Sequence, residues 1–152
     1  MSTKVESLEN AQTLTVCNML CAFDLRIGNL IDFVGMPSKV LNIKSTAKFD
    51  SLYIEHDEGF EWTEPERCKG LELTEDWLLS WKFMEMIDSA GQKCFENDIF
   101  RIYFISDNYE IEYKFLPEKG NEGRVNLFRK FHFIHELQNL YYSLSGGKSV
   151  CA

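Results

Sequence analysis

The stretch that most constrains the fold is IFRIYFISDNYEIEYKFL, residues 99–116. Apolar and polar residues alternate along its second half, which is typical of a β-strand with one buried and one solvated face. Asp107 and Asn108 at its centre tolerate the positive φ angles of a two-residue hairpin turn. With these two residues as the turn, Phe104 lies opposite Ile111, and one face of the hairpin is wholly apolar. The stretch therefore predicts an antiparallel hairpin that packs on a core.

The segment before this hairpin has the pattern of a smaller, curled sheet. Its predicted strands cover residues 30–34, 39–44 and 51–56. Turn residues separate these strands: Gly28-Asn29 precedes the first, and Gly35 with Pro37 predicts a turn before the second. Short strands joined by tight turns indicate an antiparallel sheet, and a small SH3-like barrel is one arrangement that fits.

Two helices are predicted, one on each side of the hairpin. LELTEDWLLSWKFMEMI (71–87) has Thr74 as an N-cap and an apolar stripe that extends to Met84 and Ile87. Residues 132–144 form a second, amphipathic helix, which ends at Ser145-Gly146-Gly147. The order of strands, helix, hairpin, strand and helix indicates an α+β fold in which two helices pack on an antiparallel sheet.

A chain of 152 residues with 45% hydrophobic residues predicts one domain with a substantial core. We place this domain at residues 23–147, after an N-terminal extension (1–22) and before a short tail (148–152). The extension is rich in Ser, Thr and Asn, and we expect residues 1–18 to be dispensable for folding.

Charge and cysteine content bound the class of protein. A net charge of −8 repels phosphate groups, which disfavours non-specific binding to nucleic acid or anionic membranes. Arg124, Arg129 and Lys130 form only a small basic patch. Five cysteines without a CxxC pair, no secretory signal and no apolar run of about 18 residues are typical of a reduced, cytoplasmic protein.

No catalytic or cofactor-binding motif stands out. His132, His135 and Glu136 give H-x-x-H-E, whereas the zinc protease patterns are HExxH and HxxEH, so no metal site is predicted. Cys68 lies beside Arg67 in a predicted loop, and we interpret it as an ordinary surface thiol. The sequence thus indicates no catalytic residue and no cofactor, which favours a protein that is not an enzyme.

Two groups of residues are candidates for binding. Phe60 and Trp62 lie in an acidic segment, residues 57–70, that is predicted to be an irregular loop, and aromatic anchors surrounded by charge are typical of protein interfaces. The second group is one side of the last helix, which is polar but uncharged: His135, Gln138, Asn139 and Tyr142. A solvated helix face usually carries Lys and Glu, so this side is expected to contact other polar groups, a ligand or a partner.

Three motifs carry a resemblance to a known group. DLRIGNLI (24–31), LELTEDWLLSWKF (71–83) and FIHELQNLYYSLSG (133–146) resemble motifs of small uncharacterised proteins that are common in Bacteroidetes genomes and their phages and mobile elements. Members of that group have Gln in place of Glu136 and lack the N-terminal segment. The resemblance implies a bacterial or phage source, and places any shared functional surface on the polar side of the last helix or on Arg26 and Asn29. The simpler explanation, which we favour, is that the motifs determine the fold.

Three functions follow from these features, in order of preference. The first is a small cytoplasmic binding protein of a phage or mobile element, which docks a host or phage protein through Phe60 and Trp62. The second is a small-ligand or nucleotide-binding protein, with hydrolase activity as a variant, whose pocket lies over the last helix. The third is a nucleic-acid-binding module that uses the basic patch.

Overall fold

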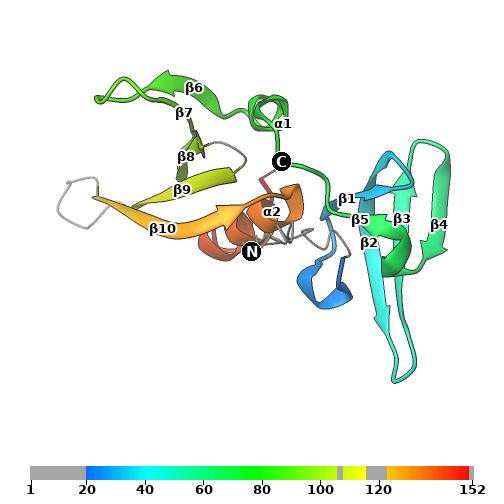
Figure 1. The fold of residues 1–152 in the computed structure, drawn as a ribbon. Coiled ribbons are helices and arrows are strands. Elements are labelled where there is room, and N and C mark those ends of the chain that lie inside the picture. Colours follow the sequence, from blue (N-terminus) through cyan, green and yellow to red (C-terminus); the bar gives the residue numbers. More distant parts are fainter. Residues whose placement is uncertain (1–19, 106–107, 116–122, 151–152) are drawn as a thin grey trace, which may run out of the picture.

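The computed structural model describes residues 20–105, 108–115 and 123–150; the predicted turn residue Asp107 and the N-terminal residues 1–18 lie outside these ranges. The described chain forms two five-stranded antiparallel sheets, two α-helices and two 3-10 helices (Figure 1). This arrangement confirms the α+β prediction. In Figure 1 the first sheet lies on the right, and the second sheet lies on the left with both α-helices beside it.

The first sheet has the strand order β4-β3-β2-β1-β5. Its strands are β1 (Leu30–Phe33), β2 (Met36–Ser45), β3 (Asp50–His56), β4 (Gly59–Thr63) and β5 (Cys68–Lys69). A first 3-10 helix, η1 (Ala22–Asp24), precedes β1, and η2 (Pro65–Arg67) leads β5 back to the edge of β1. In the described part of the chain β4 does not pair with β5, so the sheet stays open and the SH3-like barrel is not confirmed.

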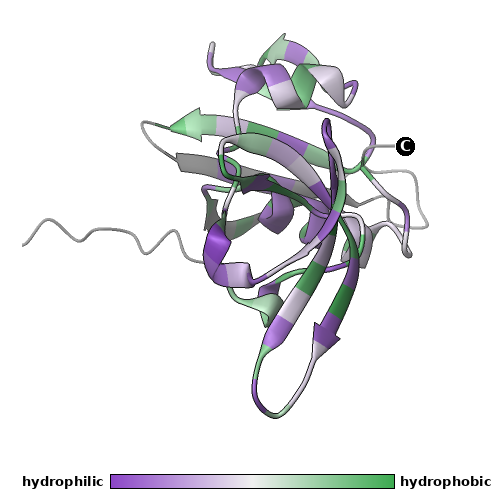
Figure 2. Cartoon of the chain, turned by 90° about the vertical axis from the view of Figure 1, so that its right-hand side faces the viewer, coloured by the Kyte–Doolittle hydropathy of each residue, from purple (hydrophilic) through white to green (hydrophobic). Residues whose placement is uncertain are grey.

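Alternation of inward and outward residues explains how this sheet forms. Along β3, Leu52 and Ile54 are fully buried while Tyr53 and Glu55 point to the other face. Figure 2 shows the same alternation of hydrophobic and hydrophilic residues along the long strands. The prediction of an irregular loop over residues 57–70 was wrong, because β4, η2 and β5 all lie within it.

The predicted turn at Gly35 and Pro37 is one residue out of place. Val34 and Gly35 make the turn, with φ angles of 50° and 83°, and Pro37 lies inside β2 opposite Asp32. A proline is tolerated there because the second residue pair of a two-residue hairpin exchanges no backbone hydrogen bond. On its other side β2 begins to pair with β3 only at Lys39, so no neighbour requires the missing N–H.

The second sheet has the strand order β10-β9-β8-β7-β6. Its strands are β6 (Met84–Ile87), β7 (Lys93–Glu96), β8 (Phe100–Ile105), β9 (Asn108–Phe115) and β10 (Gly123–Phe131). The predicted hairpin is present as β8 and β9, but its predicted register was wrong by two residues.

The observed register pairs Phe104 with Tyr109 in place of Ile111. A shift of two leaves every side chain on its predicted face, because the side-chain period of a strand is two. It also places Arg101 opposite Glu112, whereas the predicted register would have placed it opposite Lys114. Opposite charges in cross-strand positions are favourable and like charges are not, which accounts for the direction of the shift.

Helix α1 (Glu75–Ser80) is much shorter than the predicted 71–87. Its start is as predicted, since the Thr74 hydroxyl accepts a hydrogen bond from the Trp77 N–H at 3.5 Å. Its end is set by Lys82, which has a φ of 63°. The Phe83 N–H then donates back to the Leu78 carbonyl at 3.0 Å, which is the closing bond of a Schellman motif.

Residues after this stop form the edge strand β6, so the second half of the predicted helix was wrong. Met84 and Ile87, which the helical stripe would bury, are each 63% exposed. Lysine is not a usual residue at a left-handed helix end, where glycine is expected. The sequence therefore lacked the common signal for the end of α1.

Two separate hydrophobic cores form. The core of the first sheet includes Ile31, Val40, Leu52 and Ile54. The core of the second sheet includes side chains from α1, β7, β8, β10 and the last helix, α2 (Ile134–Leu144). Packing reaches into both predicted terminal segments, since Leu20 is 9% exposed and Val150 is 7% exposed.

The segment between β5 and α1 runs beside the start of α2. The Leu73 N–H donates to the His132 carbonyl, and the Ile134 N–H donates to the Leu71 carbonyl, each at 2.9 Å. Gly70 faces the Phe133 ring so closely that a Cβ atom there would lie 2.5 Å from ring atoms. The chain therefore requires glycine at position 70 for close packing.

Candidate functional site

The start of α2 explains the H-x-x-H-E pattern without a metal. A carboxylate oxygen of Glu136 accepts hydrogen bonds from the backbone N–H groups of His132 and Phe133, at 2.9 and 3.0 Å. Such a bond from the third helical residue satisfies donors that a helix start leaves unpaired. His132 lies before the helix, and the described residues contain no group of three or more side chains placed to bind a metal ion.

The polar side of α2 packs against the loop that leads into β1. The Asn29 side-chain N–H group donates to the side-chain oxygen of Asn139 at 3.0 Å and to the side-chain oxygen of Gln138 at 3.4 Å. Gln138 also accepts the Leu30 N–H at 2.8 Å and donates to the Gly28 carbonyl at 3.3 Å. We call Asn29, Gln138 and Asn139 the amide joint, because they connect the first sheet to the last helix.

Arg26 and Tyr142 extend this joint to the surface. The Arg26 guanidinium lies over the Tyr142 ring, 3.5 Å from its centre, in a cation–π contact. Asn29 holds the same loop, because its side-chain oxygen accepts the Arg26 N–H at 2.7 Å. Five of the six predicted ligand-binding residues are thus brought together from segments more than a hundred positions apart.

His135, the sixth, does not join this group. It is 5% exposed, its ring stacks on Phe133, and its Nδ1 atom has no hydrogen-bond partner in the described part of the chain. Burial holds the pKa of His135 below 6.5, and the nearby charges of Glu136 and Asp24 oppose this only in part. His135 is therefore a neutral, buried residue between the cores rather than a surface ligand.

A pocket of about 700 Å³ opens beside the amide joint. Its floor includes Leu30, Val40 and Val150, and its rim carries Arg26 and Lys39. None of the described residues that line it is acidic. Its volume lies within the range of small-molecule sites.

The outer face of the first sheet carries an exposed aromatic cluster. Tyr53 on β3 lies opposite Trp62 on β4, with ring centres 5.2 Å apart, and its ring stacks on Phe60 at 6.3 Å. Phe60 and Trp62 are 60% and 50% exposed. We call Tyr53, Phe60 and Trp62 the aromatic ladder. The sequence predicted two of its members but missed Tyr53, whose outward position follows only from the pairing of β3 with β4.

A small hollow of about 340 Å³ lies next to the ladder. It is lined by Ser51, Trp62, Thr63, Glu64 and Arg67. The Thr63 hydroxyl is buried and has no hydrogen-bond partner in the described part of the chain. An unsatisfied buried hydroxyl costs free energy, so this hollow favours a group that can hydrogen bond to Thr63.

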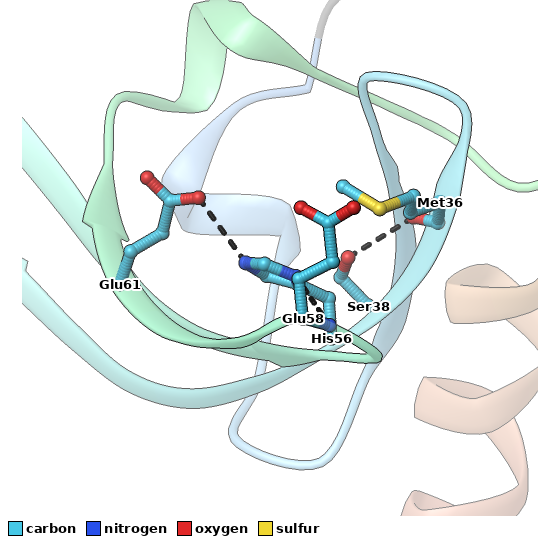
Figure 3. A network of polar contacts seen from close by, with 5 residues as sticks. All are labelled: Met36, Ser38, His56, Glu58 and Glu61. Atoms are coloured by element: carbon cyan, nitrogen blue, oxygen red, sulfur yellow. Dashed lines mark hydrogen bonds and ion pairs between the residues drawn. The ribbon is translucent and has the colours of Figure 1, made fainter.

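The opposite face of the β3–β4 hairpin holds a histidine network (Figure 3). His56 Nε2 lies 3.1 Å from a Glu61 oxygen, and the Glu58 N–H donates to His56 Nδ1 at 3.3 Å. Because Nδ1 accepts, the proton of the neutral ring lies on Nε2, which donates to Glu61. Both ring nitrogens are thus engaged, and the network fixes the hairpin that presents Phe60 on its other face.

Cys68 is not a reactive nucleophile. It lies in β5 and is 1% exposed, so the prediction of a surface thiol on a loop was wrong. Burial raises the pKa of Cys68 to about 11, although the neighbouring Arg67 lowers it in part. The thiol therefore stays protonated at neutral pH and is not a reactive thiolate.

The basic patch at Arg124, Arg129 and Lys130 lies on β10, but these side chains are outside the description of the structure. None of the helices in the described ranges has the length and apolar character needed to cross a lipid bilayer. Comparison of the chain with protein-family models, with curated proteins and with solved structures gives no match.

Proposed function

We propose that the protein is a non-enzymatic binding module, cytoplasmic and of phage or mobile-element origin, whose aromatic ladder docks a basic segment of a partner protein. The observation that carries this proposal is the exposure of Phe60 and Trp62 in contact with Tyr53 on one sheet face. Aromatic side chains give large contact areas at low entropic cost and dominate the energy of many interfaces.

Charge around the ladder selects the chemistry of the partner. Residues 55–66 contain no lysine or arginine and carry five exposed carboxylates, Glu55, Asp57, Glu58, Glu64 and Glu66, although Arg67 follows them and lines the hollow beside Trp62. A guanidinium or ammonium group can lie over an exposed aromatic ring and pair with a neighbouring carboxylate.

A peptide-display library whose members range from acidic to basic tests this proposal directly. We expect enrichment of segments that contain Arg or Lys beside apolar residues, with affinities that fall as salt rises. Phe60→Ala and Trp62→Ala should each weaken binding of an enriched peptide by about 30-fold, which corresponds to roughly 2 kcal/mol for an interface anchor.

Phe49 provides a matched control, since it is 59% exposed and lies outside the ladder. Phe49→Ala should leave peptide affinity unchanged. Equal affinities of wild type and Trp62→Ala, or enrichment of acidic segments, would show that the ladder is not the docking surface. Tight, salt-dependent binding of single-stranded oligonucleotides would instead support the nucleic-acid alternative, which uses Arg124, Arg129 and Lys130.

A further inference from the structure

We propose that the pocket beside the amide joint binds a small organic anion, a carboxylate or a phosphate carried on a planar apolar body. This site is distinct from the aromatic ladder, and it lies where the first sheet meets α2. The proposal specifies the ligand class for the pocket that the polar side of α2 led us to expect.

The charge of the pocket wall is the first argument. The whole chain carries a net charge of −8, yet among the described residues that line this pocket the charged ones are Arg26 and Lys39, both cationic. Neither forms an ion pair with a carboxylate of the described residues. Lys39 lies opposite Glu55 across the strands without forming an ion pair with it, so two cations of this pocket can attract an anion and repel a cation.

The second argument is that the Arg26 side chain is held in a fixed position. Its guanidinium lies with the Tyr142 ring at 3.5 Å, which holds the side chain in place. The N–H donors of a guanidinium lie in its plane, so this contact leaves their outward edge available for a carboxylate or phosphate. A donor group that is already held loses little freedom when the ligand binds.

The uncharged residues that line the pocket determine which kind of group can carry the anion. The amide joint faces this pocket, but its side-chain amides are engaged in hydrogen bonds with one another, with the Gly28 and Asp24 carbonyls and with the Leu30 N–H. Leu30, Val40 and Val150 contribute apolar surface. The anionic head therefore pairs with the cations, and the body contacts apolar side chains and the Tyr142 ring.

Titration with 2-naphthoate and its neutral isostere 2-naphthamide, followed by two-dimensional NMR of the backbone amides, tests the proposal. We expect saturable shifts at Leu30, Val40 and Gly147 with the anion, and at least tenfold weaker binding of the amide. Adenosine monophosphate, adenosine and inorganic phosphate form a second series, in which a phosphate on a planar body should bind more tightly than either part alone.

Lys39→Met separates a specific site from a general charge effect. It should weaken naphthoate binding about tenfold and leave naphthamide binding unchanged, whereas Lys44→Met, an exposed change on the same strand outside the pocket, should alter neither. Arg26→Gln provides a second variant with the same expected direction. Equal binding of acid and amide, equal effects of the two lysine variants, or no saturable shift with any anion would overturn the proposal.

Discussion

Asn29→Ala should be among the most destabilising single changes in the chain. Asn29 is 3% exposed, and its side chain accepts the Arg26 N–H and donates to Gln138 and Asn139. The bonds at 2.7 and 3.0 Å contribute about 0.5–1 kcal/mol each net and the 3.4 Å bond adds little, while the Arg26 N–H left unpaired costs about 1–2 kcal/mol more. We therefore expect a loss of about 2–4 kcal/mol, a large part of the 5–15 kcal/mol typical of a domain.

Urea denaturation followed by far-ultraviolet circular dichroism measures this loss as a fall of about 1–2 M in the midpoint. Asn42→Ala is the control, because Asn42 is exposed on β2 and should cost less than about 0.5 kcal/mol. Asn29→Asp keeps the shape and the acceptor for Arg26 but places a carboxylate against two amide oxygens, so it should be no better than alanine at neutral pH. An Asn29→Ala loss equal to that of Asn42→Ala would refute the role of the joint.

Three other changes have clear expected outcomes. Gly70→Ala should destabilise the fold by about 1–3 kcal/mol, because its Cβ would lie 2.5 Å from the Phe133 ring; an unchanged melting temperature would contradict this contact. Val34→Asn should raise the urea midpoint by the equivalent of about 1 kcal/mol, since Val34 has a φ of 50° and Asn-Gly is preferred in such turns; a lower midpoint would count against the turn geometry. The pKa of His135 is lowered by burial in the folded state, so the unfolded state takes up the proton first; stability should be complete above pH 6.5 and fall as pH decreases below it. Urea midpoints measured against pH should show this fall in wild type and a smaller one in His135→Phe; identical profiles would assign it to other groups.

Local patterns predicted the faces of strands well but not their partners. The alternation in residues 99–116 placed Phe100 and Ile102 on the buried face, although Phe104 on that face is 47% exposed, and any even shift of register preserves the faces. The choice between registers depended on Arg101 meeting Glu112, a cross-strand pairing. Likewise, the helical spacing of apolar residues in α1 continues by chance to Met84. The helix itself ends because Lys82 adopts a left-handed backbone conformation, which a lysine does not signal in the sequence.

For the candidate sites too, the sequence predicted local features but not long-range contacts. The absence of charge on one side of α2 correctly indicated contact with other polar groups, and the motif around Arg26 and Asn29 contained the residues that it meets. That the two motifs bind each other was not visible, because a hydrogen bond across 110 positions leaves no local pattern. This contact supports the explanation that the motifs determine the fold, while Arg26 and Lys39 beside it form no ion pair with a carboxylate of the described residues.

The amide joint also has a consequence for synthesis of the chain. Asn29 leaves the ribosome 110 residues before Asn139, which at ordinary rates of translation is an interval of about 5–20 s. Once β5 has been made the first sheet can fold on its own core, but the side-chain N–H donors of Asn29 have only water as a partner until α2 follows. A chain that lacks α2 would therefore leave the loop at Arg26 without these hydrogen bonds and accessible to proteases, whereas a chain that includes α2 would hold it in place.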